Sequence, residues 1–459
     1  MGKDFRVRDP VHDFVCLREE EVRLIGVPVF QRLRGIRQLA MADLVYPGAL
    51  HTRFDHSLGV CHVAGLLAEQ LGLGDHDVRL VRLAALLHDL GHGPFSHVSE
   101  NALERYGKRS KLEPGQKKEK IHELVTARMI RHDSEIVRIL GQDTCDEIAK
   151  LLGDGHGQPA NRAIVSGPLD ADKQDYLLRD SRFCGVTYGV FDIHQLHRSL
   201  ILEGPEDDKE LMIASDGVHA VEQYVLAKYY LTTNVYRHRV RLITDQMIVR
   251  AIRLGIERDD LDDLRRLYAF DNSEEFFENY RGWDDARFLI TLGNNDSRGG
   301  LCHEMIRRLR SRDLLKRVFA CRIRDFSSPA LQELLMSLDK RENDATRADL
   351  ERGIAEILPK QEGADINPDF VIAHTFTIRS VRVTSRNDEG SIMVACRPEP
   401  RPFEQESALF ESIDESYTEG YVEVYAPVTW ANHTERNRVK SKLEQDIRKL
   451  IESMSPRNG

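Results

Sequence analysis

Three histidines and a carboxylate crowd into one short stretch of this 459-residue chain. The stretch reads His88-Asp89-Leu90-Gly91-His92-Gly93-Pro94-Phe95-Ser96-His97 and follows the apolar run 80–87, which predicts a buried helix ending near Gly91. A buried carboxylate needs a compensating charge, because an unpaired buried charge is costly. A cation meets that need most economically. The pattern therefore indicates a metal site rather than a helix end with one isolated histidine.

A hydrolytic metal site takes its other ligands from separate elements and leaves positions open for water and substrate. His56, near the start of an upstream helix, is the best placed third ligand, with His51 and His62 as alternatives. Asp170 and Asp172 are both candidates for a carboxylate ligand from further along the chain. Nitrogen and oxygen ligands without thiolate suit Mn, Fe, Ni, Zn or Mg. We expect one divalent ion per site.

His97 and Glu100 are three residues apart, so on a helix their side chains share a face. A carboxylate that orients an imidazole is the usual support for a general acid or base. The alternative is an exposed glutamate beside a supporting histidine. His122 is a further candidate, although a lone histidine in a helical segment more often has a structural role.

Cationic and aromatic side chains near these ligands indicate an anionic substrate. Arg53 and Lys173 flank the candidate ligands, and the cluster Arg237-His238-Arg239 lies on a later segment. Arginine suits bidentate contact with phosphate, and lysine suits a point contact. A solvated helix face is the alternative for the later cluster. Tyr176 and Tyr236 could stack on, or hydrogen-bond to, a sugar or base.

The composition narrows the class of protein. A formal net charge of −10 argues against a general nucleic-acid binder, whose surface would be basic. The seven cysteines are scattered without a Cys-x-x-Cys pair, which indicates a reducing compartment. The start of the chain lacks the apolar core of a signal peptide, and no run has the length of a transmembrane helix. We expect a cytoplasmic protein.

Apolar periodicity predicts mainly helices over the first three quarters of the chain. Short extended pieces are expected within residues 5–25, and charged loop residues at 107–120. Helices are expected at 28–40, 54–71, 77–90, 121–132 and 144–152, with long helical periodicity at 217–256 and over much of 259–290 and 300–356.

The pattern changes near Pro359. Residues 376–383 and 420–425 alternate apolar and polar side chains, as half-buried strands do, and 439–454 carries a helical apolar stripe. The last hundred residues or so therefore predict a small α+β domain.

These motifs together resemble a known family. Residues 51–59, 88–97 and 170–176 are similar to the motifs of HD-superfamily deoxynucleoside triphosphate triphosphohydrolases, closer to the broad-specificity bacterial enzymes and the vertebrate SAM-and-HD-domain enzyme than to the enterobacterial dGTPase. Asp9-Pro10-Val11-His12 and 30–39 match as well. The resemblance implies a mostly α fold: an HD-domain helical core at about 45–250 within a domain 1–358, followed by an α+β domain 359–459.

The resemblance also implies an activity, the splitting of a dNTP into deoxynucleoside and inorganic tripolyphosphate. This activity would serve dNTP pool control or phage defence. Additional Mg could enter with the nucleotide. Two other functions stay open: an HD phosphodiesterase acting on a signalling nucleotide, and a non-catalytic nucleotide sensor.

Carried over residue by residue, the resemblance implies a complete site. The implied metal ligands are His56, His88, Asp89 and Asp172. The implied catalytic residues are His92, His97, Glu100, His122 and Arg53, with Glu100 supporting His97. The implied substrate-binding residues are Gln38, Lys173, Tyr176, Asp180, Lys228 and Tyr236, with Gln38 against the deoxyribose and Asp180 reading the 3′-hydroxyl. Lys228 stands where the vertebrate enzyme has an arginine.

Regulation is the point at which the chain departs from the vertebrate enzyme. Gln31 and Arg34 are retained, but Gly26 and Phe5 stand where that enzyme reads a guanine nucleotide with an aspartate and a lysine. The resemblance implies a homo-oligomer, a dimer or tetramer. It leaves two options for a subunit interface: a nucleotide activator other than a guanine nucleotide, or none. Neither a membrane nor a nucleic acid is expected as a partner.

Overall fold

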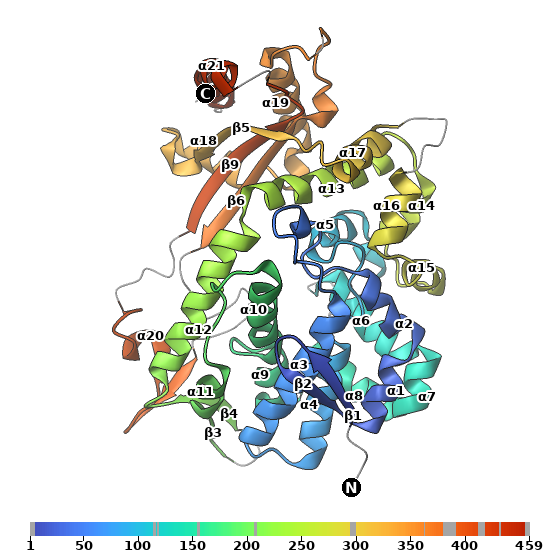
Figure 1. Cartoon of the computed structure of the whole chain (residues 1–459), viewed down its shortest axis with the longest axis vertical. Coiled ribbons are helices and arrows are strands. Elements are labelled where there is room, and N and C mark those ends of the chain that lie inside the picture. Colours follow the sequence, from blue (N-terminus) through green and yellow to red (C-terminus); the bar gives the residue numbers. More distant parts are fainter. Residues whose placement is uncertain are drawn as a thin grey trace. The chain divides into compact units, whose positions relative to one another are not determined.

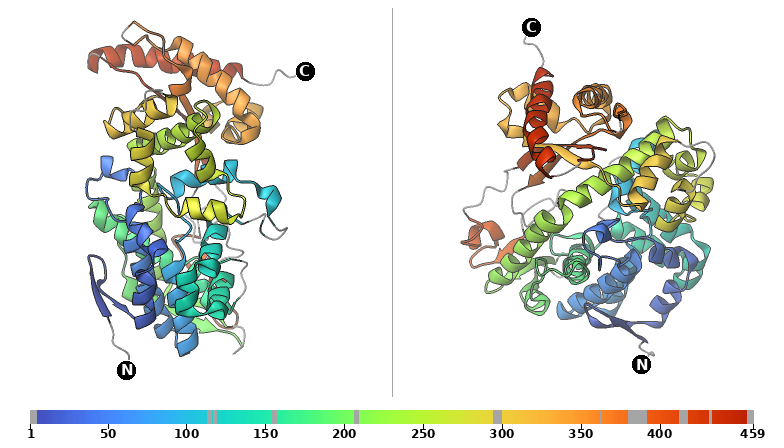
Figure 2. Two further views of the ribbon diagram at one scale, coloured as in Figure 1. Left: turned by 90° about the vertical axis from the view of Figure 1, so that its right-hand side faces the viewer. Right: turned by 45° about the horizontal axis from the view of Figure 1, so that its top comes forward.

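The helices that carry the motifs pack along their apolar residues around a common core. The computed structural model describes residues 5–112, 116, 119–153, 157–205, 209–293, 300–361, 363–379, 392–411, 418–430 and 433–454. Within these ranges α3 (Arg53–Gln70) lies beside both α4 (Asp75–Leu87) and α10 (Ala171–Cys184) (Figures 1 and 2). α3 is buried on nearly all sides, from Phe54 to Ala68. The fold is mostly α, as predicted.

The chain folds as two units. The first comprises residues 1–238, 265–288 and 381–413, and the second comprises 239–264, 289–380 and 414–459. Besides α3, α4 and α10, the helices of the first unit are α1 (Glu19–Ile25), α2 (Pro28–Gln31), α5 (His97–Tyr106), α6 (Ile121–His132), α7 (Ser134–Leu140), α8 (Gln142–Leu152), α9 (Pro159–Ser166), α11 (Ile193–Arg198), α12 (Val218–Leu231), α15 (Glu274–Tyr280) and α20 (Phe403–Glu406). α14 (Asp262–Tyr268) and α16 (Asp285–Gly293) each have residues in both units.

Two small sheets belong to the first unit. β1 (Phe5–Asp9) and β2 (Asp13–Leu17) form an antiparallel hairpin, in agreement with the extended pieces expected there. The other sheet pairs β3 (Leu200–Glu203), β4 (Glu210–Ala214), β7 (Met393–Ala395) and β8 (Arg401–Pro402) in that order. Its β4–β7 pair is parallel and joins segments far apart in the sequence.

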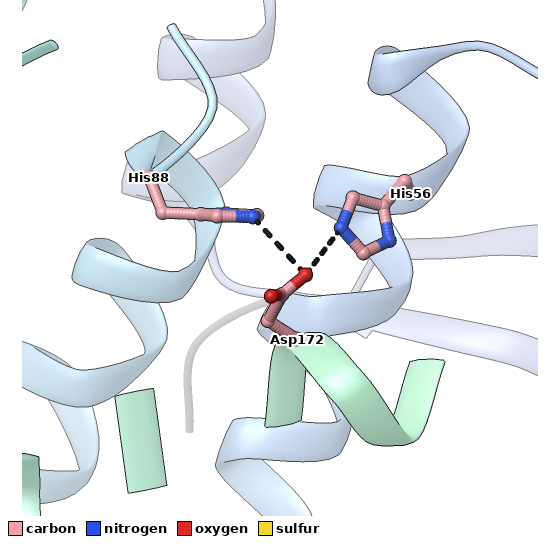
Figure 3. Close-up of side chains that lie close together, drawn as sticks. All are labelled: His56, His88 and Asp172. Carbon is pink, nitrogen blue, oxygen red and sulfur yellow. Dashed lines mark hydrogen bonds and ion pairs between the residues drawn. The ribbon is translucent and has the colours of Figure 1, made fainter. Parts of the chain in front are cut away.

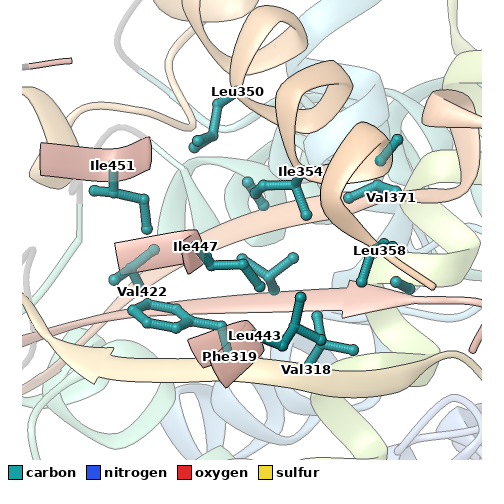
Figure 4. Packing of buried hydrophobic residues seen from close by; sticks show 14 of the residues in the cluster. Val318, Phe319, Leu350, Ile354, Leu358, Val371, Val422, Leu443, Ile447 and Ile451 are labelled. Carbon is teal, nitrogen blue, oxygen red and sulfur yellow. The ribbon is translucent and has the colours of Figure 1, made fainter. Parts of the chain in front are cut away.

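The second unit is built on a sheet in the order β5 (Lys316–Arg322), β9 (Thr418–Ala426) and β6 (Ile372–Arg379), antiparallel throughout. α19 (Asp344–Ile357) and α21 (His433–Ser453) pack against it. Figure 4 shows apolar side chains of both helices meeting the strands, among them Ile354 and Ile447, each fully buried. α13 (Arg239–Glu257), α17 (Leu301–Arg310) and α18 (Pro329–Met336) complete the unit.

The helix predicted over 28–40 is wrong beyond its first turn. α2 ends at Gln31 and a 3-10 turn, Arg32–Gly35, follows. A Cβ on Gly35 would lie 2.4 Å from Asp284 Oδ2, so the chain runs too close to another segment for most side chains there. Arg37 then pairs with Thr52 as an isolated β-bridge. Tertiary contacts override the apolar pattern at this point.

The helix predicted at 77–90 begins at Asp75 and ends at Leu87, before the stop signal at Gly91. His88, Asp89 and Leu90 therefore lie in a turn. Three further predictions need correction. A strand, β5, interrupts the helical range 300–356; a π-helical turn, Thr232–Tyr236, interrupts 217–256; and loop residues separate α14, α15 and α16 within 259–290.

The C-terminal strands and helix are confirmed: β9 covers 420–425, and α21 covers 439–453, ending one residue before the predicted end. β6 covers 376–379, whereas 380–383 lie outside the described residues. The division at residues 358 and 359 stays a prediction, because each unit of the fold draws on several chain segments. Within the described ranges, every helix is too short or too polar to span a lipid bilayer.

Candidate metal centre and active site

Three elements bring the predicted ligands together. His56 lies in the first turn of α3, where Asp55 accepts hydrogen bonds from the backbone N–H and the hydroxyl of Thr52 and fixes the helix start. His88 and Asp89 follow the last residue of α4. Asp172 lies in the first turn of α10, whose N-cap is Asp170.

The side chains of His56, His88 and Asp172 point toward one another (Figure 3). Asp172 Oδ1 lies 2.9 Å from His56 Nε2 and 3.7 Å from His88 Nε2, and the ligand atoms of the three residues lie within 4.8 Å of one another. Asp89 completes the cluster, with Oδ1 at 3.2 Å from His88 Nε2 and Oδ2 at 3.8 Å from His56 Nε2. Two imidazoles and two carboxylates therefore face one point.

The bonding of the two imidazoles fits a bound cation. His88 Nδ1 lies 2.7 Å from the Ala85 carbonyl oxygen, so Nδ1 carries the proton and donates it. In the described part of the chain, His88 Nε2 is buried without a hydrogen-bond partner, which leaves its lone pair for a metal. His56 is fully buried; burial lowers the pKa of His56, but its hydrogen bonds to Asp172 and Asp175 outweigh this and raise it to about 10. A divalent cation would supply the positive charge that these carboxylates draw onto the imidazole.

A second layer of side chains orients His56. Asp175 Oδ2 accepts a hydrogen bond from His56 Nδ1 at 2.8 Å, and Asp175 Oδ1 lies 2.6 Å from His12 Nε2. Arg179 donates to both oxygens of Asp175 and also to Asp9. Burial alone would raise the pKa of Asp175, but Arg179 and the two histidines hold it well below its usual value. Such partners fix the tautomer and ring orientation of a ligating histidine.

The second layer is packed closely enough to require a glycine. A Cβ on Gly59 would lie 1.9 Å from Asp175 Oδ1 and 2.3 Å from Arg179 Nη2. Only a residue without a side chain allows α3 and α10 to approach this closely.

Arg53 connects the metal cluster to the loop before α5. Its Nη1 donates to Asp89 Oδ2 at 2.8 Å, and its Nε donates to Ser96 Oγ at 3.0 Å. Arg53 is buried, and among the described residues its Nη2 has no hydrogen-bond partner. Burial alone would raise the pKa of Asp89, but Arg53, His88 and His92 hold it well below its usual value.

The other predicted histidines gather around Glu100. Glu100 Oε1 lies 2.7 Å from His97 Nδ1, 3.0 Å from His92 Nδ1 and 3.7 Å from His122 Nδ1. The rings of His92 and His122 stack with centroids 4.8 Å apart. Burial alone would raise the pKa of Glu100, but the histidines, His97 foremost, hold it well below its usual value. Burial lowers the pKa of His122 to about 3, so this ring is neutral at neutral pH.

A further group of polar and aromatic side chains lies around Asp180. His51 Nε2 lies 2.7 Å from Asp180 Oδ1, and the Tyr236 hydroxyl donates to Asp180 Oδ2. The rings of Tyr176 and Tyr236 are 6.3 Å apart. The backbone N–H of Gln38 donates to the His51 carbonyl, and within the described ranges the buried Gln38 Oε1 has no hydrogen-bond partner.

The remaining predicted residues lie as follows. Lys173 Nζ lies 2.5 Å from Asp170 Oδ2, so Asp170 pairs with this lysine while Asp172 joins the cluster. His62 packs against His12, with centroids 5.5 Å apart, and His51 contacts Asp180; neither belongs to the His56–His88–Asp172 group. Lys228 is half-buried on α12. Arg34 Nε donates to Gln31 Oε1, and Arg237 and His238 follow the π-helical turn.

The sequence reasoning assigned no role to Asp175, Arg179 or His12. Two signals were present. Asp175 is three residues after Asp172, which places both on neighbouring faces of α10, and His12 belongs to a motif that had matched the family.

Comparison with known proteins agrees with this geometry. The HD domain matches residues 53–180, and the HD associated region matches 191–447. Deoxynucleoside triphosphate triphosphohydrolase SAMHD1 of Homo sapiens is 30% identical over 347 residues, covering 68% of this chain and 54% of that protein. An uncharacterized protein of Methanocaldococcus jannaschii is 36% identical over 256 residues, covering 56% of this chain and 51% of its own. The chain spans about half the length of these relatives.

A solved structure shows the same fold. A hypothetical protein from Aquifex aeolicus superposes with a TM-score of 0.69 at 25% identity, covering 97% of this chain and all of that one. An HD domain implies a divalent metal ion, and the cluster of His56, His88 and Asp172 could hold one. The matched regions together reach from residue 53 to residue 447, and this chain belongs to the HD-domain family that carries the HD-associated region.

Proposed function

We propose that the protein is a metal-dependent phosphohydrolase that splits dNTPs into deoxynucleoside and inorganic tripolyphosphate. The observation that carries the proposal is that two buried polar atoms of the cluster have no hydrogen-bond partner. Among the described residues, these are Arg53 Nη2 and His88 Nε2. Unsatisfied buried polar groups are costly, and a phosphate oxygen at Arg53 and a metal ion at His88 would satisfy both.

In the proposed site, His56, His88, Asp89 and Asp172 would hold a divalent ion, which would supply Lewis-acid charge for the reaction. Arg53 would meet a phosphate oxygen through Nη2, since its Nε and Nη1 are held by Ser96 and Asp89. The charge that develops on these oxygens in the transition state is stabilised by groups that are already in place.

His97 is the proposed proton donor to the leaving group. Water attacks the α-phosphorus, the bond to O5′ breaks, and O5′ takes a proton as the deoxynucleoside leaves. Glu100 accepts the Nδ1–H of His97 at 2.7 Å, so His97 would donate from Nε2 in its doubly protonated form and be left neutral. The rings of His92 and the neutral His122 stack beside this pair, next to the proposed place of the triphosphate. The two nitrogens of His92 face Asp89 and Glu100, so His92 would act by its position and charge.

The sugar is proposed to lie against Gln38, Tyr176, Asp180 and Tyr236. Asp180 is oriented by His51 and Tyr236, so its oxygens are fixed before substrate binds. Gln38 would lie against the deoxyribose, where a ribose 2′-hydroxyl would clash. Lys173 and Lys228 remain proposed phosphate contacts.

Regulation and assembly complete the proposal. Gln31 and Arg34 are in contact with each other, and Arg34 lies over the Phe54 ring at 3.5 Å. We assign this pair to a nucleotide site in a homo-oligomer, a dimer or tetramer, in a cytoplasmic protein. The named relatives of this chain include deoxynucleoside triphosphate triphosphohydrolases, which supports the substrate class.

Product analysis tests the proposal. The purified protein is incubated with each dNTP alone and with all four together, in Mn²⁺ and in Mg²⁺, and the products are separated by chromatography. We expect deoxynucleoside and tripolyphosphate, and activity only in the mixture would indicate a nucleotide activator. The double variant His88→Ala with Asp89→Ala should be inactive. His76→Ala on α4, whose exposed side chain pairs with Glu147, is the matched control.

Intact dNTPs under every condition would contradict the proposal and favour a signalling-nucleotide phosphodiesterase or a sensor. Full activity in the double variant would also contradict it.

A further inference from the structure

The loop that joins His88 and Asp89 to His97 has an unusual backbone. Phe95 and Ser96 adopt φ values of 62° and 52°, so two consecutive residues with side chains lie in the left-handed region. Such conformations persist only where the surrounding structure holds them. The loop carries His92 and ends at His97, so whatever holds its backbone also sets the positions of both imidazoles.

The contacts come from a segment far along the chain, Tyr280–Asp285, between the end of α15 and the start of α16. The Tyr280 hydroxyl donates to the Gly91 carbonyl at 2.9 Å. Asp285 Oδ1 accepts the backbone N–H of Phe95 at 2.7 Å. Both side chains are buried. The segment lies within the HD-associated region rather than the HD domain.

Arg32 links the same segment to the neighbouring carbonyls. Its Nη1 donates to the Leu90 carbonyl at 3.2 Å and its Nη2 to the His92 carbonyl at 2.6 Å, while Nε donates to the Trp283 carbonyl at 2.9 Å. The guanidinium lies over the Tyr280 ring, 5.2 Å from its centroid. Three consecutive carbonyls, 90 to 92, are thus fixed from one side.

The other carboxylate oxygen of Asp285 contacts the backbone next to Gln38. Oδ2 accepts the backbone N–H of Arg37 at 3.0 Å, next to Gln38. The Ser96 hydroxyl donates to the Arg37 carbonyl at 2.7 Å and accepts from Arg53 Nε. One buried carboxylate therefore joins the Arg37 backbone to the loop on which Arg53 depends.

Steric fit strengthens the connection. A Cβ on Gly93 would lie 2.6 Å from the Tyr280 hydroxyl oxygen, so loop and segment are in close contact. The ring of Phe95 packs edge-on against Phe288 of α16, with centroids 5.1 Å apart. Burial raises the pKa of Asp285 to about 6, and the hydrogen bonds from the backbone N–H groups of Phe95 and Arg37 oppose this rise.

We propose that Tyr280 and Asp285, together with Arg32, are positioning residues of the active site. They hold the backbone of residues 90–96, and thereby fix the positions of His92, His97 and Arg53 relative to the substrate. The inference rests on the proposed function. In this proposal the HD-associated region contributes to the reaction indirectly, by positioning catalytic side chains, and does not contact the reacting atoms.

Two conservative variants test it, each with a matched control in the second unit. Tyr280→Phe removes only the hydroxyl, and its control is Tyr425→Phe, whose buried hydroxyl donates to Glu423. Asp285→Asn leaves one acceptor oxygen for two backbone N–H groups. Its control is Asp259→Asn, because Asp259 likewise accepts the N–H groups of Leu301 and Cys302.

Each variant is assayed for kcat, KM, bound metal, and hydrogen–deuterium exchange of peptides covering residues 90–97. We expect kcat to fall by about 10- to 100-fold, because small misplacements of catalytic groups are costly. KM should change by less than about threefold, because substrate contacts remain. Metal content should be unchanged, and exchange in 90–97 should rise. The controls should show none of these effects.

Assays with both a dNTP and bis(p-nitrophenyl) phosphate separate the two hypotheses. If only the generic phosphodiester is cleaved, the proposed substrate is wrong while the positioning role is still measured. The positioning role is overturned if kcat on either substrate matches that of the controls, if activity falls only in step with bound metal, or if exchange in 90–97 stays unchanged.

Discussion

Replacement of Asp175 by asparagine should weaken metal binding more than a comparable buried substitution elsewhere. The two oxygens of Asp175 receive hydrogen bonds from His12, His56 and, twice, Arg179. An amide keeps one of these oxygens and places an NH₂ group against the donors that faced the other. In either orientation the His56 ring loses the carboxylate charge that keeps its proton on Nδ1, so its Nε2 is less firmly held ready as a ligand.

The expected magnitudes follow from these contacts. Loss of an orienting partner of a metal-bound histidine costs about 10- to 100-fold in metal affinity, or about 1.4–2.7 kcal/mol. Leaving the buried Arg179 with only Asp9 as a full partner lowers the free energy of unfolding by about 3–5 kcal/mol. Stability alone therefore does not isolate the effect on the metal.

Glu21→Gln is the matched control, because Glu21 and Arg82 form a buried bidentate pair in the same unit without a histidine. The assay compares metal affinity, by competition with a chelating dye, with unfolding in urea for wild type and both variants. We expect similar losses of stability and a loss of affinity only in Asp175→Asn. Equal metal affinity in the two variants would refute the orienting role of Asp175.

Three further predictions concern the same unit. Glu100→Gln should lower kcat about 10- to 100-fold with little change in bound metal, because it releases His97; unchanged kcat would remove His97 as proton donor. Gly59→Ala should destabilise the fold strongly, because the new Cβ would lie 1.9 Å from Asp175 Oδ1, and urea unfolding at wild-type midpoint would contradict that. Burial raises the pKa of Asp285 in the folded state to about 6. Between about pH 4 and pH 6 the folded protein therefore keeps a proton on Asp285 that the unfolded chain has lost. The contribution of Asp285 to the free energy of unfolding should fall by about 3 kcal/mol as pH rises through this range. Asp285→Asn should abolish that part of the pH dependence of unfolding, and a slope equal to that of wild type would show that another group causes it.

Short spacings in the sequence brought together several side chains that the structure also places close to one another. His88 and Asp89 are adjacent in the chain and directly follow α4, so their closeness could be predicted from the local sequence alone. The pairing of His97 with Glu100 follows from helical spacing, and α5 confirms it. The sequence alone left open which histidine and which aspartate complete the metal cluster, because that depends on which helices pack side by side.

Contacts between distant segments explain what the sequence could not predict. No local pattern connects Tyr280 or Asp285 with a loop almost two hundred residues earlier. β5 was missed because its short run of buried residues lies between helical patterns and becomes a strand only by pairing with β9. The helix predicted over 28–40 was wrong for the same reason. Contacts with Asp284, Asp285 and Thr52 determine the backbone conformation at Gly35 and Arg37.

The fate of the attacking water oxygen tests the central claim most directly. The protein is given a dNTP and a divalent metal ion in H₂¹⁸O, and the products are examined by ³¹P NMR and mass spectrometry. Attack at the α-phosphorus with loss of O5′ predicts one ¹⁸O in tripolyphosphate and none in the deoxynucleoside. Pyrophosphate with a deoxynucleoside monophosphate, or ¹⁸O in the nucleoside, would contradict the proposed reaction.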